Sequence, residues 1–440
     1  MSTIFAPITS EISGSVNIIR ISGPDALRAL EKFSITKKII PRFAYHTDFI
    51  YQDNLIDNGL FIYFKGPNSF TGEDIIEFNI HGSPVIMKEF MSILNTIDGF
   101  SYAKNGEFSK RAFINGKIDL LQAEAINDLV KSDTKLKSEQ ALSQLKGNVS
   151  DIYEKWRKDL IDNLAILEAY IDFPDDDIDE DLVKNINSSI NQTLSDINTF
   201  LQNNKNGIKI SNGINIALIG STNAGKSSLI NELAGRDVAI VSEHAGTTRD
   251  VIETELDING LNVKISDTAG LRETENEIEK IGIERAITTA ENADIRILLI
   301  DGSKAISNAE LQNKNINDED IIVLNKSDNL HQETKKWLNN NNLITISVKD
   351  KLNIDQLLES LTQKIKSKYD WNKGFAISKE RHLIEIESIA KFLYRFDIND
   401  DLIIACENLR LAANALARIT GKIDIEEILD KIFKEFCIGK

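Results

Sequence analysis

A glycine-rich stretch in the middle of the chain has the residue types and spacing of a phosphate-binding loop. Residues 220–227 read Gly-Ser-Thr-Asn-Ala-Gly-Lys-Ser and match G-x-x-x-x-G-K-[ST] directly after the apolar run 214–219. In such a loop the backbone N–H groups and the following helix N-terminus surround phosphate oxygens. Lys226 would then reach the β- and γ-phosphates, and Ser227 would ligate Mg²⁺. The stretch therefore predicts a nucleoside triphosphate site between a strand and a helix.

Three later motifs have the chemistry that a guanine nucleotide requires. Asp-Thr-Ala-Gly at 267–270 follows a strand-like run and places a carboxylate for the Mg²⁺ shell. Thr-Thr-Arg-Asp at 247–250 lies between this motif and the phosphate loop, where a threonine would close on Mg²⁺. Asn-Lys-Ser-Asp at 325–328 follows another strand-like run, and Asp328 can accept two hydrogen bonds from guanine N–H groups. Adenine cannot supply that pair, so the motifs together predict GTP binding.

The predicted GTP site combines these motifs with flanking residues, and its predicted Mg²⁺ ligands are Ser227 and Thr248. The residues expected to bind GTP are Asn223, Ala224, Gly225, Lys226, Ser227, Ser228, Ser242, Glu243, His244, Ala245, Gly246, Thr247, Thr248, Asp267, Thr268, Ala269, Gly270, Asn325, Lys326, Ser327, Asp328, Ser347, Val348 and Lys349.

The residue after Gly270 departs from the Ras-like pattern. Ras-like proteins orient the attacking water with a glutamine at this point, but the chain has Leu271, which cannot do so. Hydrolysis must therefore use polar groups from elsewhere. Arg272 is either an internal arginine finger or a surface residue, and the acidic segment 273–279 offers a water-orienting carboxylate or forms a solvated face.

The composition excludes several other classes of protein. The 440 residues include 51 Lys and Arg against 68 Asp and Glu, a net charge of −17, which disfavours tight nucleic-acid binding by this chain alone. Hydrophobic residues make up 42% and charged residues 27%, as in globular proteins. Two cysteines are too few for a disulfide framework or a four-cysteine zinc site, so a cytoplasmic location is expected. No apolar run approaches the ~20 residues of a membrane-spanning helix.

The pattern of apolar residues predicts a multidomain fold that combines α/β and α+β parts. Residues 1–118 contain strand-like runs at 18–21, 60–64 and 75–80. Helical periodicity dominates 119–210 and 373–440, and these two stretches are expected to pack against each other. Residues 213–370 alternate strands and helices, which predicts an inserted domain with a mostly parallel sheet.

Beyond the GTP motifs, the chain resembles the MnmE (TrmE) family of tRNA-modifying GTPases across essentially its whole length. The terminal Cys-Ile-Gly-Lys is the most diagnostic part of this resemblance, because other GTPases with similar phosphate motifs lack it. The segments that carry the resemblance are 18–23, 68–74, 81–82, 106–108, 111–120, 122–125, 172–174, 246–250, 267–272 and 436–440. The resemblance implies an N-terminal folate-binding domain, a central helical domain and an inserted Ras-like P-loop GTPase domain.

The same resemblance implies a function and several partners. Family members act with a flavin-binding protein, MnmG, to place a carboxymethylaminomethyl-type group on C5 of the tRNA wobble uridine. The family's homodimers form a heterotetramer with that partner, and FAD and NADH are bound only by the partner. Transfer RNA is expected to contact mainly the partner as well. The one-carbon donor is 5,10-methylene- or 5-formyl-tetrahydrofolate, and its contacts carry over to Arg20, Glu77, Lys117 and Lys440. Folate carboxylates suit Arg or Lys, and pterin N–H groups suit Glu. The alternatives are an outward-facing strand residue for Glu77 and a surface lysine for Lys117.

Potassium dependence also carries over from the family. The implied K⁺ ligands are Asn223, Ser242, the carbonyl of His244, and Thr247, and the water-orienting glutamate maps to Glu279. A K⁺ ion there would stabilise transition-state charge when two GTPase domains dimerise. The implied catalytic residues are thus Glu279 and Lys226, together with Cys437, which is either a reactive thiol beside the folate or a packed residue.

The chain departs from the family pattern at segments 10–15 and 221–222 and at His244 and Asn105, and two other functions remain open. Residues 10–15 contain one glycine where the family has a glycine-rich folate loop, and Ser221 and Thr222 replace an Arg-Pro pair. The alternative function is a ribosome-assembly GTPase, but the chain contains no recognisable RNA-binding module. A nucleotide switch without enzymatic partners is disfavoured by the folate-type residues.

Overall fold

The computed structural model describes most of the chain. The described residues are 2–9, 14–36, 38–172, 180–221, 223–236, 239, 253–267, 291–305, 320–338, 343–369, 376–398, 401–423, 432–434, 436–437 and 439, with the backbone alone at 180–184 and 337. Contacts group the chain into two compact units, one of residues 1–127, 144–190 and 391–440 and one of residues 128–143 and 191–390. The domain boundaries at 118, 210 and 373 stay a prediction.

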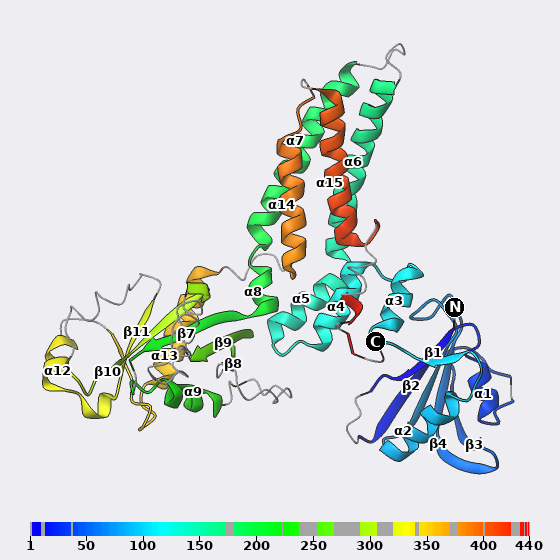
Figure 1. Ribbon diagram of the computed structural model, residues 1–440, viewed down its shortest axis with the longest axis horizontal. Helices are drawn as coiled ribbons and strands as arrows, with labels where there is room; N and C mark the ends of the chain where they lie inside the picture. The colour runs from blue at the N-terminus through cyan, green and yellow to red at the C-terminus, as the bar shows by residue number, and fades with distance from the viewer. Residues whose placement is uncertain are drawn as a thin grey trace, which may run out of the picture. The chain divides into compact units, whose positions relative to one another are not determined.

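The first unit contains a six-stranded sheet in the order β3-β4-β5-β2-β1-β6, in which only β1 and β6 pair in parallel (Figure 1). Its strands are β1 (Thr3–Pro7), β2 (Val16–Ser22), β3 (Ala44–Tyr51), β4 (Asn54–Phe64), β5 (Ile75–His81) and β6 (Phe100–Tyr102). The two helices that share its core are α1 (Arg28–Lys32) and α2 (Pro84–Leu94). The three predicted strands of this region are confirmed.

The two faces of this sheet differ in polarity because side chains alternate along each strand. Ile19 and Phe78 are fully buried in the core shared with α1 and α2. Arg20 follows Ile19 on β2, and Glu77 precedes Phe78 on β5. These two residues lie directly opposite each other, and their side chains point to the opposite face of the sheet. The alternation therefore places two charged side chains together on a face that this core does not use.

The remaining helices of the first unit include a pair formed by distant parts of the chain. The helices are α3 (Glu107–Ile114), α4 (Leu120–Val130), α6 (Asn148–Asp172) and α15 (Leu402–Thr420), while α7 (Glu180–Asn204) and α14 (Glu380–Tyr394) each contribute to both units. Figure 1 shows α6 and α15 side by side, joined by the ion pairs Arg410–Glu168 at 2.7 Å and Lys422–Glu154 at 2.6 Å. The predicted packing of the two helical stretches is confirmed. In the described part of the chain, no helix has the length and apolarity to cross a membrane.

The second unit contains a six-stranded sheet in the order β12-β11-β10-β7-β9-β8. Its strands are β7 (Ile214–Gly220), β8 (Glu253–Ile258), β9 (Leu261–Asp267), β10 (Ile295–Asp301), β11 (Ile321–Asn325) and β12 (Ile344–Thr345). Its helices include α5 (Lys135–Leu145), α8 (Gly207–Asn212), α9 (Lys226–Ala234), α12 (Gln332–Leu338) and α13 (Ile354–Lys368). Every strand pair except β8–β9 is parallel, which confirms the predicted mostly parallel sheet.

The parallel strands bring the GTP motifs to one edge of this sheet. Asp267 pairs with Leu218 across β9 and β7, and Asn325 pairs with Asp301 across β11 and β10. Both motif residues are the last residues of their strands, whereas the sequence predicted them just after the strands. The ladders extend one residue further because each motif residue still has a partner strand beside it. The carboxyl ends of β7, β9, β10 and β11 therefore surround one location, where open α/β sheets bind ligands.

Helix α5 anchors the β8–β9 hairpin, which joins two of the predicted nucleotide-binding segments. The N–H of Leu136 donates to the carbonyl of Gly260 in the hairpin turn at 3.3 Å. The side-chain amide of Asn262 on β9 donates to Asp133 at 3.0 Å. The hairpin is thereby held at its turn, so its other end presents Asp267 to the edge described above.

Candidate GTP site and N-terminal ligand site

The phosphate loop runs from the end of β7 to the start of α9, as predicted. Gly225 adopts a φ of +97°, and a Cβ atom there would collide with the side-chain amide of Asn325. Only glycine fits this position, because it tolerates the left-handed conformation and has no side chain. Lys226 is 5% exposed, and its ammonium donates to the carbonyls of Gly220 at 2.7 Å and Ser221 at 3.1 Å. The ammonium group of Lys226 therefore lies within the loop. When a nucleotide binds, its phosphate oxygens can replace these two carbonyl oxygens as hydrogen-bond acceptors.

Asn325 connects the base-recognition motif to the phosphate loop. Its side chain is 3% exposed and donates to the carbonyl of Ala224 at 2.8 Å. Its amide oxygen accepts a hydrogen bond from the N–H of Val348 at 3.2 Å. Three predicted site residues from three separate segments thus meet at one side chain. Because a buried amide with both ends satisfied is rigid, it fixes the spacing between the loops that hold phosphate and base.

Asp328 is held ready to accept hydrogen bonds. The buried hydroxyl of Ser347 donates to its carboxylate at 2.7 Å and accepts from the N–H of Asp350 at 3.2 Å. The hydrogen bond from Ser347 holds the pKa of the Asp328 carboxyl below its usual range. The group is therefore ionised near neutral pH and offers acceptor oxygens only, which is the requirement for pairing with two guanine N–H groups.

Lys326 has a partner that the sequence motifs did not indicate. The ammonium of Lys326 lies 2.8 Å from the carboxylate of Asp301, a 5% exposed residue that also accepts from Ser303 at 2.6 Å. Burial raises the pKa of the Asp301 carboxyl, but hydrogen bonds from Lys326 and Ser303 outweigh it and leave the pKa lowered. Asp301 therefore holds Lys326 in place within the base-recognition motif. Asp301 could have been found from its place at the end of the apolar run that forms β10, because β10 neighbours β11 in the sheet.

Magnesium chemistry fits the described residues. Ser227 lies in the first turn of α9, directly after Lys226, and Asp267 ends β9, which pairs with the strand that leads into the phosphate loop. A hydroxyl and a carboxylate are the oxygen ligands that Mg²⁺ prefers, with phosphate oxygens and water completing its shell. When bound, the ion would neutralise charge on the phosphates.

Much of the predicted switch region lies outside the described residues. The positions concerned are Ser242, Glu243, His244, Ala245, Gly246, Thr247, Thr248, Thr268, Ala269, Gly270, Leu271, Arg272 and Glu279, together with Lys440. Of the implied K⁺ ligands, only Asn223 is described, and it adopts a φ of +66° within the phosphate loop. The potassium site and the water-orienting role of Glu279 stay predictions.

In the first unit, the structure brings together two of the implied folate residues. Arg20 Nε donates to Glu77 Oε1 at 2.8 Å, and both side chains are 18% exposed. The guanidinium also lies over the rings of Phe70 and Phe108, with 5.2 Å and 5.6 Å to the ring centroids. Lys117 is exposed and lies on the turn after α3, with its aliphatic chain beside Gly72. A charged pair against two aromatic rings can hold a flat, polar ring system.

The C-terminal segment docks beside this pair. The N–H of Gly106 donates to the carbonyl of Cys437 at 3.4 Å, and Gly106, with a φ of +64°, has room only for hydrogen where Phe433 approaches. Gly439 lies against the carbonyl of Pro7, one residue beyond the strand pair Ala6–Arg20. Cys437 is exposed, and its bond to Gly106 places it on the first unit beside the start of α3. Its catalytic role stays a prediction.

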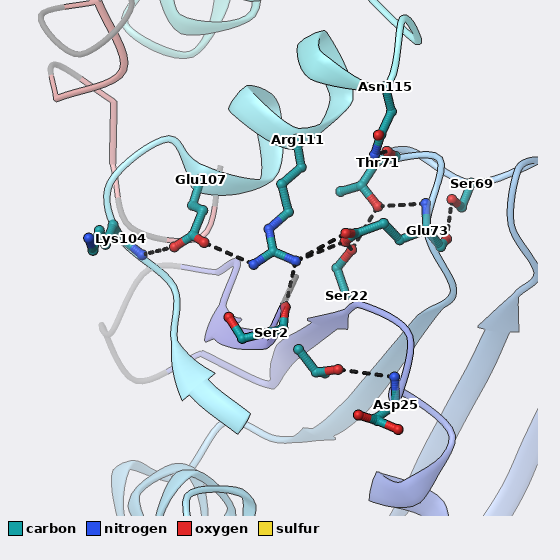
Figure 2. Close-up of polar contacts among 11 residues, drawn as sticks. Ser2, Ser22, Asp25, Ser69, Thr71, Glu73, Lys104, Glu107, Arg111 and Asn115 are labelled. Atoms are coloured by element: carbon teal, nitrogen blue, oxygen red, sulfur yellow. Dashed lines mark hydrogen bonds and ion pairs between the residues drawn. The ribbon is translucent and has the colours of Figure 1, made fainter. Parts of the chain in front are cut away.

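Arg111 organises a buried polar network that the sequence analysis did not single out (Figure 2). Its guanidinium donates to the carbonyl of Ser2 at 2.8 Å, to Glu73 at 3.1 Å and to Glu107 at 3.0 Å. Glu73 also accepts from Ser22 Oγ on β2 at 2.7 Å. Because Arg111 is only 7% exposed, these buried bonds fasten α3 to the residue just before β1, to β2 and to the loop before β5. Its place in a family-like segment was the available signal.

The phosphate loop follows β7, and the Asn-Lys-Ser-Asp motif is bonded to this loop through Asn325. This combination defines a P-loop protein of the GTPase class. Residues 3–117 match the family model described as the GTP-binding protein TrmE N-terminus, and residues 120–437 match the MnmE helical domain. The chain therefore belongs to the MnmE (TrmE) family.

Individual relatives agree with this assignment. The chain is 39% identical to the tRNA modification GTPase MnmE of Rickettsia prowazekii, with 100% of both chains covered. It is 40% identical to the protein of that name from a Wolbachia strain of Drosophila simulans, covering 100% of this chain and 99% of the relative. Among solved structures, an Era variant from Aquifex aeolicus is 23% identical over 40% of this chain and 66% of its own, with a TM-score of 0.29.

Proposed function

We propose that this chain hydrolyses GTP and acts with an MnmG-type flavoprotein to modify C5 of the wobble uridine of tRNA. The observation that carries the proposal is the Ser347–Asp328–Asn325 arrangement, which supports a guanine-specific site in a chain that is 39% identical along its full length to a tRNA modification GTPase. The added group is proposed to be of the carboxymethylaminomethyl type. The protein is proposed to work as a cytoplasmic homodimer, and the partner is proposed to supply most of the tRNA contacts.

The proposed hydrolysis uses groups that this chain supplies around the phosphate loop. Lys226 would bind the β- and γ-phosphates, Ser227 and Thr248 would ligate Mg²⁺, and Glu279 would orient the attacking water. Since Leu271 cannot orient water, the extra transition-state charge stabilisation is assigned to K⁺ on Asn223 and the segment 242–247. The position of Asn223 inside the loop supports this assignment.

GTP turnover is expected to be at least about tenfold faster in KCl than in NaCl at equal ionic strength. A positive charge beside the developing negative charge lowers the barrier, and each ~1.4 kcal/mol of stabilisation gives tenfold in rate. The measurement is steady-state phosphate release, with Asn223→Ala as the variant that should lose the difference. Equal rates in the two salts would refute the potassium site.

We further propose that the Arg20–Glu77 pair contributes to binding a tetrahydrofolate. The aromatic rings of Phe70 and Phe108 beside the pair fit a flat heterocycle, and the Glu77 carboxylate fits the N–H groups of a pterin. When bound, the group would supply a one-carbon unit. Lys117 and Lys440 are proposed to bind its carboxylates.

Glu77→Gln is expected to weaken 5-formyl-tetrahydrofolate binding about tenfold or more, because an amide replaces an acceptor-only carboxylate and the charge-assisted bonds are lost. Isothermal titration calorimetry on the full chain measures this. Glu89→Gln changes the same charge at an exposed position of α2 and serves as the matched control. A Glu77→Gln protein that binds as tightly as the wild type would remove Glu77 from the site.

Nucleoside mass spectrometry tests the proposed function as a whole. Transfer RNA is taken from cells that lack their own protein of this family, with and without this gene. Restored aminomethyl-type substituents at C5 of the wobble uridine would establish the modification and identify the added group. Unchanged uridine, with the protein folded and the partner present, would contradict the proposal and favour a role in ribosome assembly.

A further inference from the structure

A cavity of about 750 Å³ lies beside α3, between the N-terminus and the C-terminal segment. It is lined by Ser2, Ala103, Lys104, Asn105, Glu107, Lys110, Arg111, Ile114, Phe433 and Lys434. Three segments far apart in the sequence thus form its wall, and all of them belong to the first unit. We refer to it as the α3 cavity. None of the described folate-type residues Arg20, Glu77 and Lys117 lines it, so it is a separate feature.

The wall of the α3 cavity has an excess of positive charge. Its single acidic residue, Glu107, is already engaged, because one carboxylate oxygen accepts from Arg111 and the other from the N–H of Lys104 (Figure 2). Arg111 is in turn balanced by Glu107 and Glu73. The ammonium groups of the lining residues Lys104 and Lys434 come in addition to this balanced network. A local positive excess is notable because the whole chain has a net charge of −17.

The distribution of exposure in the cavity favours a polymer over an enclosed small molecule. Lys104, Asn105 and Lys434 are exposed, so the cations and an amide stand at the rim in contact with solvent. Ile114 is 54% exposed and offers an apolar surface beside them. Flexible, hydrated ammonium groups at a rim suit backbone phosphates, and an adjacent apolar side chain suits a sugar or base face.

The cavity also adjoins the C-terminal segment. Gly106, which lies between the lining residues Asn105 and Glu107, donates to the carbonyl of Cys437. From there the segment reaches Gly439 beside Pro7, next to the strand pair that presents Arg20. A polyanion held in the α3 cavity would therefore lie beside the Arg20–Glu77 pair.

We propose that the α3 cavity binds backbone phosphate of the tRNA anticodon loop, through Lys104 and Lys434, and so brings the target nucleotide to the N-terminal ligand site. This inference rests on the proposed function, and it adds a local RNA contact to a chain whose overall charge opposes RNA binding.

Fluorescence anisotropy with a labelled anticodon stem-loop tests the proposal on the full-length protein across a salt series. Lys104→Glu and Lys434→Glu are each expected to weaken binding about five- to tenfold near 0.1 M salt. Each should also reduce the slope of log K against log salt by about 1, as for one lost phosphate contact. Lys104→Arg should keep most of the affinity, because it keeps the charge. Lys88→Glu, an exposed lysine of α2 outside the cavity, is the matched control and should bind nearly as the wild type does.

Several outcomes would overturn the assignment. One is that the wild-type protein does not bind the RNA at low salt. Another is that both glutamate variants keep the wild-type affinity and the wild-type dependence of log K on log salt. Displacement of the RNA by inorganic phosphate at equal charge concentration would assign the cavity to a small anion, and displacement by 5-formyl-tetrahydrofolate would assign it to folate carboxylates. Failure of the proposed function has a different signature, because the wild-type gene would then fail to restore the modified uridine. Rates of GTP hydrolysis by the two variants should equal the wild-type rate, since neither lysine lies in the GTP site.

Discussion

Replacing Asp328 by asparagine is expected to lower GTP affinity at least about 100-fold and to raise the affinity for xanthosine triphosphate. The carboxylate accepts from Ser347 and is ionised near neutral pH, since that hydrogen bond lowers its pKa. Guanine presents two N–H donors to it. An amide presents one acceptor and one NH₂ donor, so a donor would face a donor, and sites built for a hydrogen bond discriminate by large factors when it cannot form. Xanthine has a carbonyl where guanine has an amino group, which matches the amide.

The measurement is calorimetric titration of both nucleotides into the wild-type and Asp328→Asn proteins. Asp350→Asn is the matched control, because Asp350 is an exposed acid in the loop after β12, and it is the backbone N–H of Asp350 that donates to Ser347. It makes the same change of charge and should leave both affinities within about twofold. If Asp328→Asn binds GTP as the wild type does, the base is recognised elsewhere and the guanine site proposed here is wrong.

Replacing Arg111 by methionine is expected to lower the local free energy of unfolding around α3 and β1 by about 3 kcal/mol. The guanidinium is almost fully buried and is the common partner of Glu73, Glu107 and the carbonyl of Ser2. Methionine fills similar space but donates nothing, so the carbonyl of Ser2 loses this donor and both carboxylates lose their buried cation, keeping only the bonds from Ser22 and from the N–H of Lys104. Removing one partner from a buried ionic network costs about 3–5 kcal/mol, and partial exposure of the glutamates favours the lower value.

Hydrogen exchange is the suitable measurement, because a multidomain chain does not unfold in one step. Amides of β1 and α3 should exchange about 100-fold faster in Arg111→Met, since ~1.4 kcal/mol corresponds to tenfold. Arg28→Met is the control, because exposed Arg28 makes a single bond to the carbonyl of Asp98 at 2.9 Å. The double variant Arg111→Met with Glu73→Gln should recover part of the protection. Wild-type exchange in both elements would show that the network does not hold α3.

The sequence by itself determined the features that depend on neighbouring residues. The phosphate loop needs glycines at set spacings and a lysine at the start of a helix, so residues 220–227 specify it locally. Apolar runs predicted the strands β2, β4 and β5 of the first unit, the strand β7 before the phosphate loop, and a mostly parallel sheet in the second unit. Since parallel strands have their carboxyl ends at one edge, the order of the motifs also placed Asp267 and Asn325 near the loop.

Only the tertiary structure decided which side chains complete these sites. Asp301 reaches Lys326 because β10 and β11 pair with Asp301 opposite Asn325, and Ser347 reaches Asp328 because the loop after β12 folds back on the motif. Arg111 meets Glu73, and the C-terminal segment meets β1, across separations of tens or hundreds of residues. Such contacts depend on strand register and on the path of the chain between elements. Local pattern constrains neither of these, because the same apolar spacing is compatible with many long-range pairings.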